Sequence, residues 1–175
     1  MKFTELPLNQ EILNGITEAG FTDVMPVQIK TLEHTLQGKD VLVQSQTGSG
    51  KTIAFLISIL ENILKENLPE KKALIIVPTR ELAVQIENEA KLLNKYTNFL
   101  MGCFYGGVGY NQQYKLLQNN VDIVIGTPGR LIDLNKSRKM DFRDFNQLII
   151  DEADRLFDMG FYDDINYMLD RMVPN

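Results

Sequence analysis

The sequence predicts an α/β protein in which helices cover both faces of a mostly parallel sheet. Short runs rich in β-branched residues alternate with longer segments of helical periodicity, a pattern typical of parallel sheets. Several of these runs are continuously apolar, as expected for strands covered on both faces. The length of 175 residues, 44% of them hydrophobic and 23% charged, suits one globular domain with a sizeable core.

The chain opens with helices. Asn9 is a candidate N-cap for a first helix, because apolar residues recur at helical spacing after it. A second helix is predicted from Pro26, which suits a first helical turn, to Gly38. We therefore expect residues 1–38 to form a helical segment that packs on a domain formed by residues 39–175.

From Asp40 onward, strands and helices alternate. We expect Thr79 and Thr127 to be N-caps of helices that follow two of the strands. The predicted strands are 40–45, 73–77, 99–105, 121–125 and 147–151, and the predicted helices are about 51–67, 80–96, 110–118, 128–135 and 161–172.

The charge distribution argues against a nucleic-acid-binding protein when it is taken alone. The net charge is −5, and residues 141–175 contain nine acidic and three basic residues. Because no strongly basic stripe is present, any nucleic-acid function has to be supported by motifs.

Other features of the composition exclude several classes of protein. One cysteine and one histidine exclude an internal disulfide framework and a multi-cysteine metal site, and they argue against a histidine-based catalytic triad. No apolar run is long enough to cross a bilayer, and the N-terminus lacks a secretory signal. We therefore expect a soluble intracellular protein that has no membrane partner.

Residues 45–52, Ser-Gln-Thr-Gly-Ser-Gly-Lys-Thr, form a candidate phosphate-binding turn between a predicted strand and a predicted helix. Glycines let backbone N–H groups surround an anion, and the helix N-terminus adds its positive dipole end. Lys51 would reach the β- and γ-phosphates, and the Thr52 hydroxyl would coordinate Mg²⁺. The strict Walker A pattern has glycine where this chain has Ser45. The residues expected to bind the nucleotide here are Thr47, Gly48, Ser49, Gly50, Lys51 and Thr52.

An acidic segment completes the predicted nucleotide site. Asp151 and Glu152 follow the apolar run 148–150, at the strand end where parallel sheets bind ligands. Asp151 can hold Mg²⁺, usually through water, and Glu152 can orient or deprotonate an attacking water. An isolated acidic tetrapeptide is usually a solvated helix start. Together with the phosphate-binding turn, it predicts catalytic roles for Lys51, Asp151 and Glu152.

The residues Asp-Glu-Ala-Asp at 151–154, together with the turn at 45–52, resemble the DEAD-box RNA helicase family, specifically its N-terminal RecA-like domain. Four further stretches fit that family in the expected order. The resemblance implies a RecA-like P-loop NTPase fold, ATP and Mg²⁺ as cofactors, RNA as a partner and a cytoplasmic location. The four stretches are Gly20-Phe21 with Gln28 (Q motif), 78–83 (motif Ia), Gly106-Gly107 (the glycine pair) and 127–130 (motif Ib).

The resemblance also assigns roles to single residues. The Gln28 amide offers a donor and an acceptor that complement the N7 and N6 groups of adenine, and Phe21 would stack on the adenine face. The family usually has proline where Val24 stands and a small hydroxyl residue where Met25 stands.

By analogy with the family, four residues would lie along one RNA strand and contact its backbone without reading bases. Asp154 would couple the acidic segment to the rest of the enzyme. The four RNA-binding residues are Arg80, Gly107, Thr127 and Arg130.

Three hypotheses follow. We interpret the chain as a monomeric fragment of an RNA helicase that opens short duplexes, because it stops before the family's motif III and second RecA-like domain. The fragment alone would then be a nucleotide-binding module with little turnover, since the arginine finger that stabilises transition-state charge is on the second domain. A P-loop translocase acting on DNA is less favoured, because the adenine-reading segment and motifs Ia and Ib follow the RNA family.

Overall fold

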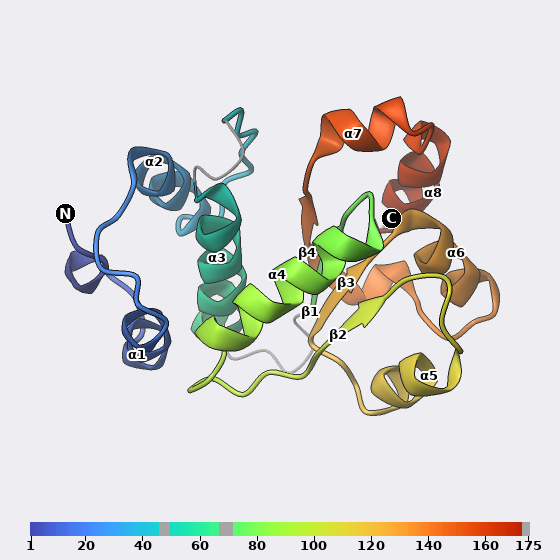
Figure 1. The fold of residues 1–175 in the computed structure, drawn as a ribbon, viewed down its shortest axis with the longest axis horizontal. Coiled ribbons are helices and arrows are strands. Elements are labelled where there is room, and N and C mark those ends of the chain that lie inside the picture. The colour runs from blue at the N-terminus through green and yellow to red at the C-terminus, as the bar shows by residue number, and fades with distance from the viewer. Residues whose placement is uncertain (46–49, 67–71, 173–175) are drawn as a thin grey trace. The chain divides into compact units, whose positions relative to one another are not determined.

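The computed structural model describes residues 1–45, 50–66 and 72–172 (Figure 1). The chain divides into two compact units. The N-terminal unit comprises Met1–Leu68 and Asn88–Asn98, and the sheet unit comprises Pro69–Glu87 and Phe99–Asn175.

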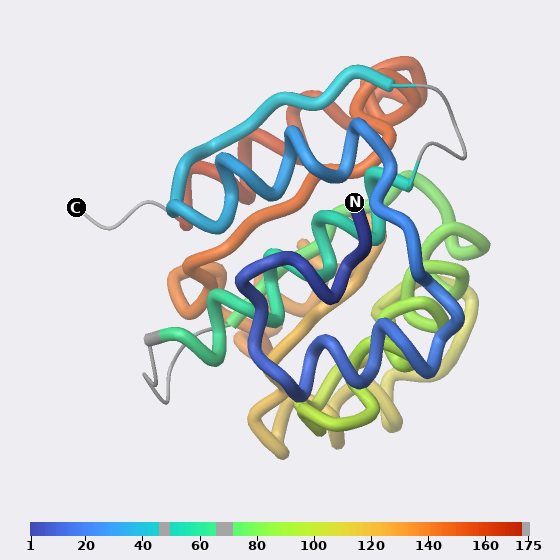
Figure 2. Tube along the Cα trace, turned by 90° about the vertical axis from the view of Figure 1, so that its left-hand side faces the viewer, coloured from blue at the N-terminus to red at the C-terminus, as the bar shows by residue number. Residues whose placement is uncertain are grey.

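The N-terminal unit is helical, and the predicted early helices are confirmed. Figure 2 follows the chain from α1 through α2 into α3, and both α1 and α2 contact α3. Its fully buried side chains include Ile12, Ile16, Leu32, Leu56, Ile57 and Leu60. Its elements are a 3-10 turn at Phe3–Glu5, α1 (Gln10–Glu18), α2 (Pro26–Thr35), α3 (Lys51–Glu66) and the end of α4 (Arg80–Leu93).

A buried carboxylate connects the start of α1 to α3. Asn9 is the N-cap residue of α1 as predicted, but its side chain makes no capping bond. It instead donates from Nδ2 to Oε2 of Glu61 at 3.0 Å, and its backbone N–H donates to Oε1 of the same carboxylate. Burial raises the pKa of Glu61, although the two bonds from Asn9 act in the opposite direction. This contact fixes the N-terminal segment on the helix that begins with Lys51.

The sheet unit contains four parallel strands in the order β2-β3-β1-β4, which confirms the predicted α/β fold class. Each predicted strand from residue 73 onward is present within a few residues. The strands are β1 (Lys72–Ile76), β2 (Met101–Phe104), β3 (Ile123–Gly126) and β4 (Phe145–Ile150). The helices are the start of α4, then α5 (Asn111–Gln118), α6 (Pro128–Lys136), α7 (Ala153–Asp158) and α8 (Tyr162–Met172), with a 3-10 turn at Phe142–Asp144.

Helices cover both faces of this sheet. On one face, Leu74 of β1 and Phe104 of β2 are fully buried in a cluster that includes side chains of α6, α7 and α8. Successive side chains of a strand point to opposite faces, so Cys103 lies on the other face. There its thiol donates to the carbonyl oxygen of Ala83 in α4 at 3.2 Å.

The strand predicted at 40–45 is wrong. Residues 41–45 belong to no strand, and the side chain of Leu42 is 98% exposed. A β-strand exists only where a neighbour satisfies its backbone N–H and C=O groups. The four strands of the sheet unit lie elsewhere in the sequence, from Lys72 onward, so no strand is assigned at 40–45.

Of the described residues, none belongs to a helix that combines the length and apolar character needed to span a membrane.

Gly15 provides a test of the packing of α1 in the N-terminal unit. A Cβ at this position would lie 2.4 Å from the backbone oxygen of Leu93, which cannot move without shifting α4. Gly15→Ala should therefore lower the free energy of unfolding by about 2 kcal/mol, as overpacking in a buried site does. The measurement is urea unfolding. Gly129→Ala, also in a helix but with no atom within 4 Å of the new Cβ, should be neutral or stabilising. Equal effects of both substitutions would contradict the packing argument.

Candidate functional site

The predicted site residues fall into both compact units. Those assigned to the nucleotide lie in the N-terminal unit: Phe21, Gln28, Gly50, Lys51 and Thr52. Lys51 is also assigned to hydrolysis. The other residues assigned to hydrolysis, and those assigned to coupling and RNA, lie in the sheet unit: Asp151, Glu152, Asp154, Arg80, Gly107, Thr127 and Arg130. The convergence of the two groups on one magnesium–triphosphate site therefore stays a prediction.

Ser45 and residues 50–52 are the described residues of the phosphate-binding turn, and the predicted nucleotide-binding residues Thr47, Gly48 and Ser49 lie outside the described residues. Gly50 has a φ of +88°, in the left-handed region that favours glycine. Lys51 and Thr52 are the first two residues of α3, and both are half-buried. The predicted transition from a turn to a helix N-terminus is therefore present at Lys51.

Gln28 connects the second helix to this turn. Gln28 is 3% exposed. Its Oε1 accepts from the backbone N–H of Met25 at 2.8 Å, and its Nε2 donates to the carbonyl oxygen of Gly50 at 3.1 Å. The same Gly50 oxygen also accepts from the N–H of Ala54 in the first turn of α3. Gln28 thus holds the end of the turn as well as the start of its own helix.

The two bonds of Gln28 use one of its two amide hydrogens and one of the two lone pairs on its oxygen. The predicted bidentate contact with adenine would draw on the remaining donor and lone pair. Phe21, the predicted stacking residue, is half-buried just after α1, where its N–H donates to the Ile16 carbonyl at 3.2 Å.

Met25, where the family usually has a small hydroxyl residue, lies against the turn. Its sulfur is 3.0 Å from the position that a Cβ on Gly50 would occupy. The exchange therefore places a thioether, rather than a hydroxyl, beside the phosphate-binding turn.

The acidic segment begins where β4 ends. Asp151 is 4% exposed, and its N–H donates to the carbonyl oxygen of Ile76, which extends the pairing of β4 with β1 by one residue. One oxygen of its carboxylate accepts from the N–H of Glu152 at 3.0 Å. Asp154 lies on the exposed surface in the first turn of α7. The strand end predicted for the acidic segment is confirmed.

Glu152 adopts a conformation that the sequence did not predict. Its φ of 54° and ψ of 52° place it in the left-handed region, which costs a non-glycine residue about 1–2 kcal/mol. Its side chain is half-buried and pairs with Arg155 at 3.5 Å. Strain of this kind gathers at functional sites. No sequence pattern predicts this left-handed conformation, because glutamate is rarely found at positive φ.

Three of the predicted RNA residues lie together around residues 105–110, the loop that follows β2. Arg80, exposed at the start of α4, places its guanidinium 4.9 Å from the centre of the Tyr105 ring. A Cβ on Gly107, whose φ is +86°, would lie 4.0 Å from Nη1 of Arg80. The guanidinium of Arg130 donates to the carbonyl oxygen of Val108 at 3.2 Å. Residues from the segments that follow β1, β2 and β3 therefore lie together at this loop.

Thr127 is the N-cap residue of α6 as predicted, but its side chain makes no capping bond. Its backbone N–H donates to the carbonyl oxygen of Phe104 at 3.1 Å, which places it next to the end of β2. Thr79 does cap α4, since its hydroxyl accepts from the N–H of Leu82 at 3.2 Å. The two helix starts therefore differ: the Thr79 hydroxyl is used within the protein, and that of Thr127 makes no capping bond.

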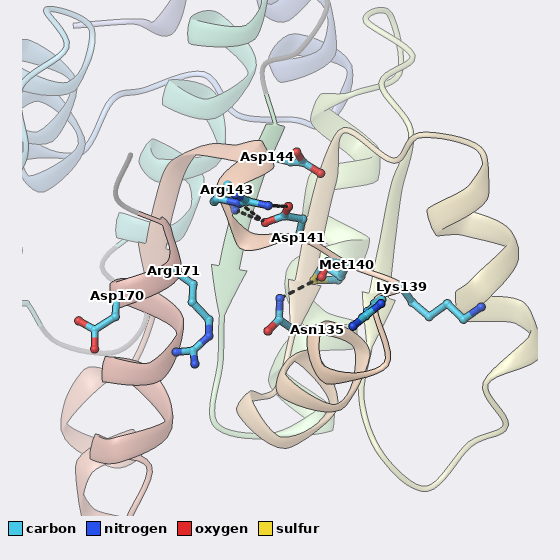
Figure 3. A pocket seen from close by; sticks show the side chains of 9 residues that line it. Asn135, Lys139, Met140, Asp141, Arg143, Asp144, Asp170 and Arg171 are labelled. Atoms are coloured by element: carbon cyan, nitrogen blue, oxygen red, sulfur yellow. Dashed lines mark hydrogen bonds and ion pairs between the residues drawn. The ribbon is translucent and has the colours of Figure 1, made fainter. Parts of the chain in front are cut away.

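A pocket of about 630 Å³ lies elsewhere in the sheet unit and contains none of the predicted site residues (Figure 3). Nor do the described histidine, cysteine, aspartate and glutamate side chains include a group of three or more that could hold a metal ion. The pocket is lined by Asn135, Arg138, Lys139, Met140, Asp141, Arg143, Asp144, Asp170 and Arg171.

A parallel α/β sheet, a helix that begins at Lys51 directly after Gly50, and an acidic segment at the end of a strand are typical of P-loop nucleotide-binding proteins. The profile of the DEAD/DEAH box helicases matches residues 25–175, so the chain belongs to that family.

Named relatives resemble the chain over nearly its whole length. It is 44% identical over 173 residues to an ATP-dependent RNA helicase RhlB of Pseudoalteromonas atlantica, covering 97% of this chain and 41% of that protein. It is 45% identical over 172 residues to an RhlB of Actinobacillus succinogenes, covering 96% and 42%. A crystal structure of a hypothetical ATP-dependent RNA helicase from Sulfolobus tokodaii matches with a TM-score of 0.87 and 41% identity, covering 94% of this chain and 47% of that one. The chain thus spans about two fifths of the length of these curated relatives.

Gly50 tests the contact between Gln28 and the turn. A Cβ at Gly50 would lie 2.5 Å from Nε2 of Gln28, so Gly50→Ala should displace that amide. Gly38→Ala is a matched control, because Gly38 also has a positive φ but has no atom within 4 Å of the new Cβ. Both variants should lose about 1 kcal/mol of unfolding free energy from backbone strain. Gly50→Ala should lose about 1–2 kcal/mol more for the displaced buried amide. Urea unfolding measures the difference, and equal losses would show that the contact contributes nothing.

Glu152 tests the strain at the acidic segment. Glu152→Gly should raise the free energy of unfolding by about 1 kcal/mol, because glycine adopts the left-handed conformation without penalty. Glu152→Ala removes the same carboxylate but keeps the Cβ, so it should not stabilise the protein. Thermal unfolding of both variants provides the measurement. If the alanine variant is as stable as the glycine variant, the carboxylate and not the backbone is the source of the effect.

Proposed function

We propose that this chain is the ATP- and RNA-binding lobe of an ATP-dependent RNA helicase, which opens short RNA duplexes by using Mg-ATP hydrolysis. The observation that carries the proposal is the pair of bonds made by Gln28. Its amide joins the segment assigned to adenine recognition to the carbonyl of Gly50, at the end of the turn assigned to the phosphates. The proposal is further supported by relatives that are named ATP-dependent RNA helicases.

In this proposal, Lys51 binds the β- and γ-phosphates at the N-terminus of α3, where the helix dipole also favours negative charge. The hydroxyl of Thr52 and the carboxylate of Asp151 are hard oxygen donors of the kind that Mg²⁺ prefers, and they would hold it. The bound ion would neutralise charge on the phosphates. Glu152 orients the attacking water and accepts its proton.

The proposed RNA surface is the carboxyl edge of the sheet unit. Arg80 supplies an exposed positive charge, and Gly107 supplies exposed backbone. Thr127 lies at the N-terminus of α6, and its side chain makes no capping bond. Arg130 belongs to the same surface through its bond to Val108. Contacts of these kinds bind a sugar-phosphate backbone without reading bases. They also require few cations, which suits a chain with a net charge of −5.

A second candidate is that the chain alone is a monomeric nucleotide-binding module with little turnover. It is favoured because the family resemblance places the arginine finger, which stabilises transition-state charge, on a second RecA-like domain. In that case the second RecA-like domain is the partner that completes the site for ATP hydrolysis, and Asp154 of this chain couples the acidic segment to it. A cytoplasmic location, where ATP and RNA are both available, is part of the proposal.

Two substitutions test the roles in hydrolysis. In the whole protein, Lys51→Ala and Glu152→Gln should each lower the RNA-stimulated ATPase rate by about 100-fold or more, as the loss of an electrostatic or general-base group does. Glu152→Gln should leave ATP affinity within about threefold of wild type, because the carboxylate acts on water rather than on the nucleotide. A coupled ATPase assay and fluorescent ATP titration provide the readouts.

Matched controls are Lys65→Ala, in the last turn of the same helix as Lys51, and Asp158→Asn, exposed in α7. Both should retain the ATPase rate. Activity near wild type in Lys51→Ala or Glu152→Gln would contradict the assigned roles. Equal stimulation by RNA and DNA would instead favour a translocase that does not select RNA, and strong RNA-dependent turnover by residues 1–175 alone would exclude the second candidate.

A further inference from the structure

A buried polar bridge supports the loop at 105–110. Arg130 is 8% exposed and Gln113 is 4% exposed, and the guanidinium of Arg130 donates from Nη1 to Oε1 of Gln113 at 3.1 Å. The pair joins α6 to α5, and both residues belong to the sheet unit. Bonds made by the bridge reach two carbonyl oxygens of the loop.

Each partner of the bridge holds a different point of the loop. Gln113 donates from Nε2 to the carbonyl oxygen of Tyr105 at 3.2 Å, where the loop leaves β2. Arg130 donates from Nη2 to the carbonyl oxygen of Val108 at 3.2 Å, near the middle of the loop. The ring of Tyr110, at the far end, lies 4.0 Å from the guanidinium carbon of Arg130. The start, middle and end of the loop are therefore all held by the same pair.

The composition of the loop explains why it needs such support. Residues 105–110 read Tyr-Gly-Gly-Val-Gly-Tyr, and glycine loses more conformational freedom on ordering than any other residue. A Cβ on Gly106 or Gly109 would meet no atom within 4 Å. The loop's own glycines therefore supply no side-chain packing, and its conformation depends on the groups that hold its carbonyls.

The contacts of Arg130 also limit what its side chain can do for a ligand. A buried charge is costly unless hydrogen bonds compensate it. Here two neutral oxygens and an aromatic face surround the guanidinium. These bonds use two of its five N–H groups, and moving the side chain outward to reach a phosphate would break both of them and leave the Val108 carbonyl without this donor.

We infer that Arg130, acting with Gln113, is a positioning residue that holds the 105–110 loop in the conformation that presents Gly107 and Arg80 to RNA, and that its guanidinium does not itself bind a phosphate. The inference rests on the proposed function, since RNA is the ligand of this surface. It separates Arg130 from Arg80, whose exposed guanidinium lies against the ring of Tyr105 and would contact RNA directly.

The test uses the whole protein and single-stranded RNA of mixed sequence. Arg130→Lys keeps the charge but loses the two-pronged geometry, and Gln113→Ala removes the bridge without changing any charge. Each should weaken RNA affinity roughly tenfold, the value of a buried charge-assisted hydrogen bond. The double variant should be no weaker than either single variant, because residues that act through one contact are not additive. Arg138→Lys, an exposed arginine of the same unit that lines the pocket of Figure 3, is the matched control and should bind as wild type.

Two further readouts separate positioning from a phosphate contact and from general destabilisation. The dependence of RNA affinity on salt should keep its wild-type slope in Arg130→Ala and Gln113→Ala, whereas Arg80→Ala should lower that slope by about 1. Amide hydrogen exchange should become faster at residues 106–110 in both bridge variants, while ATP affinity without RNA stays unchanged.

The outcomes distinguish this inference from the proposed function. Failure of the wild-type protein to bind RNA overturns both. Wild-type binding that is weakened by Arg80→Ala but not by Gln113→Ala overturns only the inference. It is also overturned if Arg130→Ala lowers the salt slope by about 1 while Arg130→Lys binds as wild type, which is the behaviour of a direct phosphate contact, or if ATP affinity falls in parallel with RNA affinity.

Discussion

Parallel pairing of the strands is the constraint on which the candidate residues of the sheet unit depend. In a parallel sheet all strands end at the same edge, so segments that follow different strands become neighbours. Here the register of β1 with β3 and β4 places the start of α4, Thr127 and Asp151 at one edge. The N–H of Asp151 continues that pairing by one residue, to Ile76. A carboxylate and two helix starts are thereby brought to the same edge by the pairing of the strands.

The glycine residues are a second feature on which the candidate sites depend. At Gly50 the absence of a Cβ admits both the turn and the amide of Gln28. At the 105–110 loop, by contrast, glycine leaves open space, and a buried arginine and glutamine replace the missing packing. The same residue type therefore serves opposite purposes. In the first case it permits a close contact, and in the second it exposes backbone that other residues must hold.

The sequence predicted most of the elements, because helical periodicity and apolar runs report burial directly. It failed at 40–45, where an apolar run satisfies the pattern of a strand but pairing depends on a partner that periodicity does not identify. Motif resemblance named Gln28 and Arg130, but their bonds to Gly50 and Val108 join residues 22 positions apart in each case. The left-handed backbone of Glu152 was also not predictable from the sequence, because it reflects the constraints of the fold rather than a conformational preference of glutamate.

The acidic composition and the proposed RNA surface are reconciled by where the cations are placed. A basic stripe binds through many exposed charges, each screened by salt. In the sheet unit, one arginine of the proposed surface is exposed and another is buried under a loop of glycines. The buried charge acts through geometry, because it fixes carbonyl positions and thereby the direction of the neighbouring N–H groups. Backbone N–H groups held in this way contribute to anion binding without raising the net charge. Composition alone therefore underestimates how well such a surface can bind a sugar-phosphate backbone.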